Sequence, residues 1–492
     1  MAETPERLVP DDVIPHKHLP PLRYRDLPEP IPLRKMIGPS IMLTGLALGS
    51  GEFVFWPYIT YRVGFIFFWA CLLGVGTQYF LNMEIERWTM ATGESAVTGF
   101  CRLSWHWSWV FLLLNIIPWA WPGWATGAAT MLSWLVWEPA HDPINGTLES
   151  QHVAVLAVAG LLLVGVVLTL GPVVYNTVEK LQLVLVSLVF VLMIVLAIAV
   201  VRPPHVAALV RGSLSVGTMP PLSGNLDMMF LLGALAFAGA GGTTNLCQAN
   251  YIKDKGYAMG RYIGRITSPV TGNEEAVSDI GYHFEHTPEN MRRWHGWWRA
   301  ASWEHLLTFV LPCAVSLALL SLISYALIYG SEANYSRNFS FILGQADEIG
   351  ARLGSAMRLA FLVIGIAVLL TTELGVLDAC ARISTDIVKV NYCRNVDWIT
   401  DSRLYFAFLW GEIALGCVIL LGFGVAEPQK LLKISAAMNG GVMFLYSLVL
   451  LYLNNKVLSR RLSMHPVRFV AVVWSCAFFG YFTIKALGSV LS

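Results

Sequence analysis

Long apolar stretches recur along the whole chain, and each could cross a lipid bilayer as a helix. A spanning helix needs about 20 mostly apolar residues, and by this measure the sequence predicts about eleven of them. Hydrophobic residues make up 56% of the 492 residues and charged residues only 13%, which excludes a water-soluble protein of this length. We therefore expect an all-α integral membrane protein. The predicted spans are 36–61, 65–90, 107–135, 152–171, 175–201, 227–252, 303–329, 353–386, 403–424, 429–454 and 466–490.

The loops between these spans predict the orientation of the chain. Basic residues concentrate in 253–302 and 455–465, whereas 136–151 has no Lys or Arg. The positive-inside rule therefore places the N-terminus in the cytoplasm and, with an odd number of spans, the C-terminus outside an inner or plasma membrane. The expected units are an extended cytoplasmic tail at 1–35, helices 1–5 at 36–201, helices 6–10 at 202–454 and helix 11 at 455–492.

Within the second unit, residues 257–302 form an insertion that is too long for a plain connection. Thr287 followed by Pro288 predicts a helix start, because threonine caps helices and proline suits their first turn. The tryptophans and arginines that follow favour a separate helix lying at the cytoplasmic membrane interface.

Two predicted spans carry clusters of helix-weakening residues near mid-membrane. They occupy corresponding positions in two successive sets of five helices, as expected for an inverted repeat with broken helices 1 and 6. In lipid, freed backbone groups are tolerated only where they face protein or a water-filled cavity, so paired breaks predict a binding site. The predicted binding residues are Gly49, Ser50, Gly51 and Glu52 in helix 1, and Gly239, Gly241, Gly242, Thr243, Thr244 and Asn245 in helix 6.

The same segments resemble the Nramp family of divalent-metal transporters. Gly38-Pro39 leads after eleven residues to 49–52, where the family has its metal motif Asp-Pro-Gly-Asn. Residues 239–246 match the family's helix 6 pattern Ala-x-x-Met-Pro-His-Asn-Leu, and the end of helix 2 supplies Gln78, Arg87, Thr92 and Gly93. This resemblance implies the leucine-transporter fold of the amino acid–polyamine–organocation superfamily, with a five-plus-five inverted repeat and one extra helix. It also implies proton-coupled transport by alternating access.

The departures from the family pattern concern the metal ligands. The family's Asp falls on Gly49, its Asn on Glu52 and its sulfur ligand Met on Gly242. A thioether helps to select softer transition metals, and this sequence lacks that ligand for selective manganese or iron binding. Glu52 remains as the predicted metal ligand or proton-coupled switch, supported by carbonyls near 47–49 and 239–242.

A second resemblance competes with the first. The stretch "GSGEFVFWP" is similar to the Gly-Ser-Gly-Ile-Phe-x-x-x-Pro pattern of amino-acid transporters in the same superfamily. Glu52 would repel an anionic group there and would suit a cation or an ammonium. We rank a divalent cation as cargo first, and an amino acid or small organic amine second. A third hypothesis is a sensor that keeps the fold and transports nothing.

Further residues are predicted to couple or gate the site. Glu373 is an acid near mid-membrane, and such acids often relay protons or ions. Glu412 is similarly deep, but a structural role is favoured for it. The coupling and gating candidates are Gln78, Thr371, Thr372, Glu373 and Asn439.

Helix 3 contains "NIIPWAWPGW", in which Pro118 and Pro122 predict a kink. Trp119, Trp121 and Trp124 could stack on an organic cation if they faced the site. Ordinary packing is the favoured hypothesis for these rings.

Enzyme activity and cofactors are not expected, because the sequence has no P-loop, dinucleotide fingerprint or HExxH motif. The net charge of +1 gives no reason to expect nucleic-acid binding. The expected partners are membrane lipid, the cargo, and protons or sodium as coupling ion.

Overall fold

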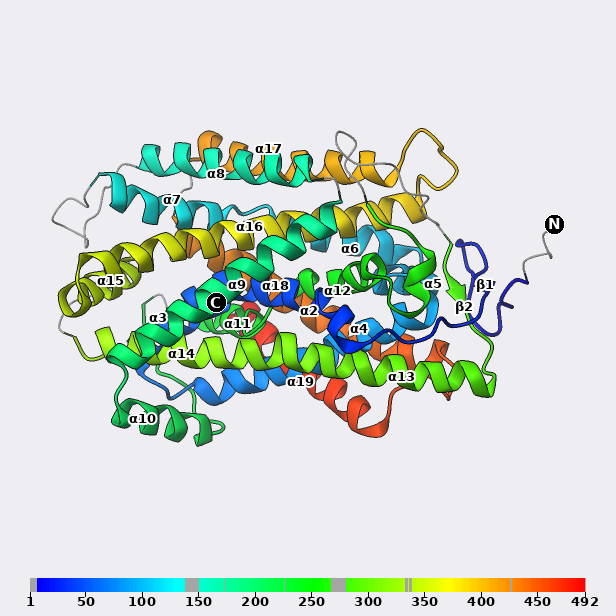
Figure 1. Cartoon of the computed structure of the whole chain (residues 1–492), viewed down its shortest axis with the longest axis horizontal. Helices are drawn as coiled ribbons and strands as arrows, with labels where there is room; N and C mark the ends of the chain where they lie inside the picture. Colours follow the sequence, from blue (N-terminus) through cyan, green and yellow to red (C-terminus); the bar gives the residue numbers. More distant parts are fainter. Residues whose placement is uncertain are drawn as a thin grey trace.

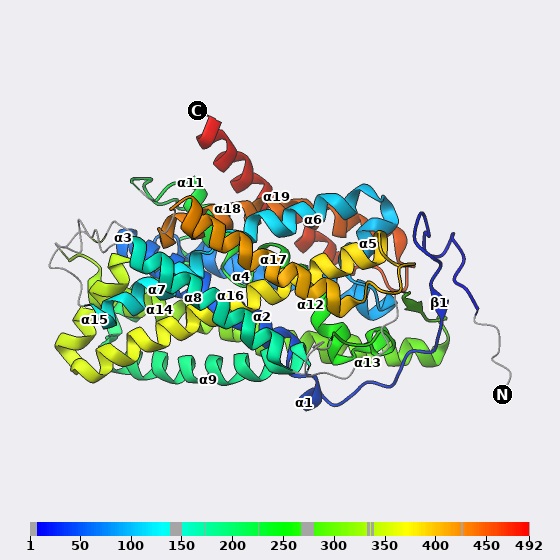
Figure 2. The same cartoon turned by 90° about the horizontal axis from the view of Figure 1, so that it is seen from above.

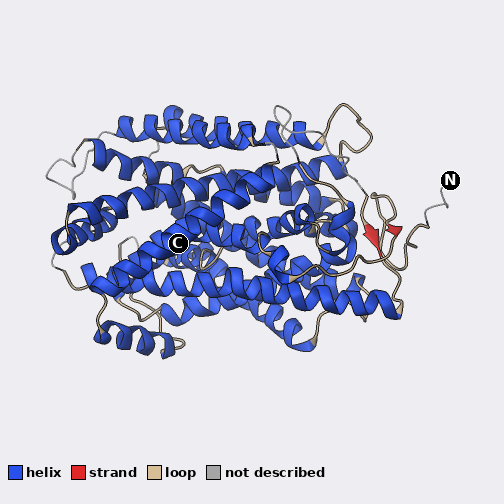
Figure 3. Ribbon diagram, in the orientation of Figure 1, coloured by secondary structure: helices blue, strands red, loops and turns tan. Residues whose placement is uncertain are grey.

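Helices occupy all of the predicted spans (Figures 1 and 3). The structure is a computed structural model that describes residues 7–137, 150–171, 173–224, 226–266, 280–331, 335, 339–424 and 427–491. In order of the predicted spans, the helices are α2 (Pro39–Ala47), η1 (Leu48–Phe55) and α3 (Trp56–Val63); α4 (Phe68–Thr92); α6 (His106–Trp119) and α7 (Gly123–Val136); α8 (Ser150–Leu170); α9 (Val174–Val200); α11 (Met228–Ala236) and α12 (Gly242–Lys255); α13 (Pro288–His305), η3 (Leu306–Val310) and α14 (Leu311–Ile328); α16 (Ser355–Asn391); α17 (Asp401–Gly422); α18 (Pro428–Tyr452) and η4 (Leu453–Val457); and α19 (Pro466–Leu491).

Seven helices in the described ranges are long and apolar enough to cross a membrane, so the chain is a membrane protein. The other predicted spans are also helical, but α6–α7 and α11–α12 are interrupted, while the first two spans are more polar. The seven are His152–Leu170, Val174–Val200, Pro288–Ile328, Ser355–Asn391, Asp401–Gly422, Pro428–Val457 and Pro466–Ser489.

The long helices run roughly along one axis of the molecule (Figures 1 and 2). α8 packs on α7 and α17, and α16 contacts both α7 and α17. Two further helices, α10 (Pro203–Leu214) and α15 (Ser340–Leu353), lie near one end of this bundle, whereas the N-terminal segment lies at the other (Figure 1). The C-terminal part of α19 projects from the bundle in Figure 2.

The N-terminal segment packs on the bundle and does not extend freely. Val9, Leu22 and Leu27 are fully buried. A short strand, β1 (Arg23–Tyr24), pairs in parallel with β2 (Tyr282–His283) from the insertion. The remaining short helices at this end are α1 (Leu33–Met36), α5 (Ala96–Leu103) and η2 (Ala258–Tyr262).

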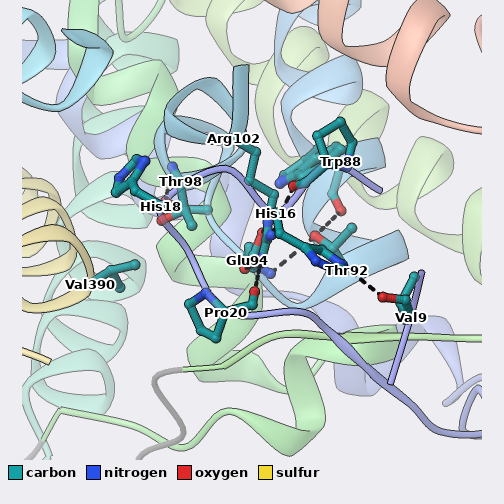
Figure 4. Close-up of polar contacts among 12 residues, drawn as sticks. Val9, His16, His18, Pro20, Trp88, Thr92, Glu94, Thr98, Arg102 and Val390 are labelled. Carbon is teal, nitrogen blue, oxygen red and sulfur yellow. Dashed lines mark hydrogen bonds and ion pairs between the residues drawn. The ribbon is translucent and has the colours of Figure 1, made fainter. Parts of the chain in front are cut away.

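A buried arginine holds this segment against the bundle (Figure 4). Arg102 on α5 forms a two-pronged ion pair with Glu94, with nitrogen–oxygen distances of 2.6 and 2.7 Å. Its other N–H groups donate to the backbone carbonyls of Pro15 and Pro20, both at 3.0 Å. A buried guanidinium needs hydrogen-bond partners, and the tail supplies two carbonyls in addition to Glu94.

The prediction of a separate interfacial helix is wrong. Thr287 does cap the start of a helix, because its hydroxyl accepts from the backbone N–H of Asn290 at 3.2 Å. That helix, α13, runs on without interruption through η3 into α14. Trp294 and Trp297 are buried, and the Trp297 indole donates to the Pro28 carbonyl at 2.8 Å. The tryptophans were expected at a lipid interface, but these two pack within the protein; residues 267–279 of the insertion lie outside the described residues.

The burial of His283 in β2 makes stability depend on pH. Burial lowers the pKa of His283 to about 4, with a further lowering by His286 and an opposing effect of the Ala91 carbonyl that its ring N–H bonds. The unfolded chain, with an ordinary His pKa of about 6.5, therefore binds this proton first. Stability from the neutral ring is complete above pH 6.5 and falls as the pH drops towards 4, by at most about 3 kcal/mol. Thermal unfolding between pH 7 and 4 should show a steeper loss for wild type than for His283→Gln, and equal slopes would contradict the assignment.

Candidate functional site

Helix 6 is interrupted where its glycines predict a break. α11 ends at Ala236 and α12 begins at Gly242. Gly239, Gly241 and Gly242 have φ angles of +145°, +75° and +58°, a region that glycine adopts readily and other residues rarely do. The sequence therefore breaks the helix through backbone conformations that favour glycine, deep inside the protein.

Helix 1 is not broken, and this part of the prediction is wrong. Gly49, Ser50 and Gly51 lie inside η1, a π-helical segment that joins α2 to α3 without interruption. The widened turns keep backbone hydrogen bonds, such as that from the Trp56 N–H to the Gly51 carbonyl. The two glycines loosen the helix without opening it, so no interruption frees the carbonyls near 47–49.

The glycines of helix 1 allow close approach by other helices. A Cβ on Gly51 would overlap the backbone carbonyl of Phe237 in the helix 6 break. A Cβ on Gly49 would overlap the hydroxyl of Thr372 on α16, which donates to the Gly45 carbonyl at 3.1 Å. The structure thus brings predicted residues of helices 1, 6 and 8 together.

Glu52 is fully buried, and its carboxylate contacts α14. Oε2 accepts a hydrogen bond from Ser316 on α14. Oε1 has no hydrogen-bond partner in the described part of the chain. Successive helical residues point about 100° apart, so the contact of Gly51 with Phe237 directs the next side chain elsewhere. Glu52 and the glycines 239–242 are therefore not joined into one ligand set.

Side chains of the protein itself bind the free backbone groups of the break. Gln78 donates to the Ala236 carbonyl at 2.8 Å and accepts from the Gly241 N–H at 3.2 Å. Thr244 donates to the Gly241 carbonyl. Asn245 donates to the Tyr446 hydroxyl at 3.0 Å, which adds a residue that the sequence prediction missed.

Asn439 on α18 occupies the space next to Gly242. A Cβ on Gly242 would overlap its amide, and its Oδ1 accepts from the Thr243 N–H at 3.4 Å. Thr372 lies beside Gly49 in the same way. Gly49 and Gly242 stand where the resembled family has its Asp and Met ligands. The Thr372 hydroxyl lies beside the first and the Asn439 amide beside the second. Among the residues that the structure places, no group of three or more His, Cys, Asp or Glu side chains could hold a metal ion.

An aromatic cluster covers the break. Trp119 stacks on Phe237 with ring centroids 5.9 Å apart, and Trp124 lies 5.6 Å from Trp119. The Trp119 indole donates to the Thr243 hydroxyl at 2.6 Å. These rings reach the site because helix 3 is interrupted between α6 and α7, near the two prolines. Trp119 and Trp124 pack within the protein, as the favoured hypothesis had it, and the structure places them against the helix 6 break.

The remaining helix 8 candidates face other neighbours. Thr371 donates to the Ala367 carbonyl of its own helix at 2.7 Å. Glu373 accepts from the Ala125 N–H near the start of α7 at 3.2 Å. Glu412 on α17 accepts from the Cys380 thiol of α16 at 3.2 Å.

Comparisons with known proteins agree with this architecture at the level of fold. No protein-family model matches the sequence, and no curated protein matches it either. The structure is similar to that of the Eremococcus coleocola manganese transporter in complex with an aromatic bis-isothiourea substituted compound, at 12% sequence identity and a TM-score of 0.67, over 94% of this chain and 89% of that one. Two mutant structures of the same transporter match at 12% identity and a TM-score of 0.66, over 94% of this chain and 90% of theirs. The predicted resemblance is thereby confirmed at the level of fold: the chain shares the fold of this manganese transporter.

Proposed function

We propose that this protein is a secondary active transporter that binds its cargo between η1 and the α11–α12 break. The observation that carries the proposal is the interrupted helix 6, whose backbone groups lie deep in a membrane bundle. Such interruptions persist in membrane proteins where they line a binding site or cavity. The likeness to a manganese transporter supports transport as the activity. The five-plus-five inverted repeat, rocking of one helix bundle against the other, a cytoplasmic N-terminus and an external C-terminus are part of this proposal.

The lining of the break favours a small organic amine as cargo. The groups around it are neutral amides and hydroxyls, from Gln78, Asn439 and Thr243, together with the stacked ring of Trp119. Aromatic faces attract organic cations, and amide oxygens accept hydrogen bonds from ammonium groups. Selective transition-metal binding needs softer or charged ligands, and the positions that would provide them are lined by a hydroxyl and an amide.

A divalent cation is the second candidate cargo. Glu52 is a fully buried acid whose Oε1 lacks a partner in the described ranges, and it follows Gly51 directly. If the carboxylate turned from Ser316 towards the break, it would add a charge to carbonyl and amide oxygens that suit a hard cation. Protons are the proposed coupling ion for either cargo, with sodium as the alternative.

Uptake into proteoliposomes separates these candidates. With an organic cargo, Trp119→Leu should lower uptake of an amine such as phenethylamine at least tenfold, because the stacked wall is lost. With a metal cargo, Glu52→Gln should abolish Mn²⁺ uptake, whereas Trp119→Leu should change it little. Trp474→Leu, on the exposed face of α19, is the matched control. Absence of flux for amines, amino acids and divalent metals alike would favour the sensor hypothesis instead.

A further inference from the structure

A second buried polar cluster lies apart from the break, where four helices meet. α2, α4, α12 and α13 each contribute polar side chains that water does not reach. Burying several polar groups is costly unless hydrogen bonds satisfy them. Each donor is therefore expected to face an acceptor, and this expectation indicates where the hydrogen atoms lie. We call this set the Glu86 cluster; it consists of Ser40, Asn82, Glu86, Gln248, Glu304 and His305, all at most 1% exposed.

Glu304 has more hydrogen-bond donors than Glu86. Its Oε2 accepts from the Ser40 hydroxyl at 2.5 Å. It also accepts from the backbone N–H groups of Gly38 and Ser40, at the start of α2. The Thr308 hydroxyl lies 3.0 Å from its Oε1 and 2.7 Å from its backbone carbonyl. These donors and the helix N-terminus favour a negative charge on Glu304 over one on Glu86.

His305 is the neutral member of the cluster. Ser40 has one hydroxyl hydrogen, and it is donated to Glu304. The Nδ1 of His305, 2.8 Å from the Ser40 oxygen, therefore donates to it. Nε2 then accepts from the Asn82 amide at 3.3 Å. Both ring nitrogens are satisfied by an uncharged imidazole with its hydrogen on Nδ1.

Glu86 has the opposite environment from Glu304. Its Oε1 accepts from the Gln248 amide at 2.9 Å and lies 3.6 Å from His305 Nδ1, whose hydrogen is already donated to Ser40. Its Oε2 is buried and has no donor within the part of the chain that is described. An ionised carboxylate in this place would have one oxygen without compensation, and a second acid, Glu304, lies nearby. A proton on Glu86 removes that cost.

The basic side chains nearest the cluster lie beside Glu84, so they do not take the place of a proton on Glu86 in neutralising its charge. Arg468 on α19 lies 3.6 Å from Glu84 Oε1, and its guanidinium covers the ring of Trp298 at 4.7 Å. Arg87 is bonded to the same Glu84 at 2.6 Å. The other groups that face the cluster are Tyr79 on α4, which stacks on His305, Tyr175 on α9 and Tyr257 directly before η2.

We propose that Glu86 binds the proton that is coupled to transport, in a site separate from the cargo site. The Ser40–Glu304 and Ser40–His305 bonds tie the start of α2 to the end of α13. Movement of α2 away from α13 would break both bonds and admit water to Glu86, which would then release its proton. The coupling role rests on the proposed transport function, whereas the proton on Glu86 in the closed state does not.

Infrared spectroscopy of the purified full-length protein tests the proton directly, without any cargo. At neutral pH, Glu86→Gln should remove the C=O band of one protonated carboxyl group. Glu304→Gln is the matched control and should leave this band in place, because the donors around Glu304 favour its charged form. Glu86→Asp should shift the band, and this variant replaces Glu86→Gln in the test if Glu86→Gln does not fold. An unchanged carboxyl band in Glu86→Gln would overturn the proposal.

Proton flux into proteoliposomes tests the coupling, with Mn²⁺ and phenethylamine as the added probes. Wild type should acidify the lumen when one of them is supplied, and Glu86→Gln should transport that probe with at least tenfold less proton flux. Equal proton flux in the two proteins would overturn the coupling role of Glu86. If the infrared band behaves as expected but wild type moves neither probe nor protons, the transport function fails and the proton site stands.

Discussion

Replacing Gly51 by alanine should destabilise the protein, although the same exchange elsewhere in a helix is usually favourable. Alanine stabilises a helix interior by about 1 kcal/mol relative to glycine. At Gly51, however, the added Cβ would overlap the Phe237 carbonyl, a backbone atom that no rotamer change can move. Overpacking of this kind costs about 1–3 kcal/mol and can cost more, so we expect a net loss of stability and the loss of cargo uptake.

The matched control is Gly76→Ala on α4. A Cβ there would meet no atom within 4 Å, so only the helix propensity changes. Thermal unfolding of both purified variants should show a lowered midpoint for Gly51→Ala and an equal or raised midpoint for Gly76→Ala. If the two variants behave alike, η1 does not pack against the helix 6 break as described.

Arg382→Met should destabilise the fold by about 3–5 kcal/mol, since it removes the cation from a buried ion-pair network. Arg382 is fully buried, lies 2.9 Å from Asp378 on its own helix and also pairs with Asp254. Its loss would leave two buried carboxylates without a counter-charge. Chemical unfolding in detergent would measure the change.

Arg352→Met provides the comparison for this prediction. Arg352 pairs with Glu348 at 3.0 Å, but both side chains are more than two-fifths exposed, and such pairs contribute at most about 1 kcal/mol. Adding Asp254→Asn and Asp378→Asn to Arg382→Met should restore part of the lost stability, because the two unpaired charges are then removed. A loss for Arg382→Met no larger than that for Arg352→Met would show that the network is solvated.

The features that depend on local sequence were predictable. The positions of the helices follow from apolar length alone, and the interruption of helix 6 follows from glycines that adopt positive φ angles. The Thr287 cap was also predicted, because a cap depends on its own residue and the first turn. These features need no knowledge of distant neighbours.

The errors arose where a distant neighbour decides the outcome. Glycines in helix 1 permit either a break or a close helix contact, and only the position of Phe237 shows that contact was selected. The direction of Glu52 follows from the same contact. The tryptophans of α13 suit a membrane interface by composition, but the tail residue Pro28 accepts the hydrogen bond of Trp297. Side-chain chemistry alone does not reveal such partners.

The hydrogen bonds of Gln78 have a kinetic consequence for the proposed carrier. A carrier must return without cargo after each delivery. Unpaired backbone groups inside a bilayer would raise the free energy of that empty state by roughly several kcal/mol. The Gln78 amide binds the Ala236 carbonyl and the Gly241 N–H as an arriving solute could. In the proposed carrier, Gln78 would act as a tethered substitute ligand that keeps the return step accessible. Cargo must displace it, so the measured affinity is the difference between two competing sets of hydrogen bonds.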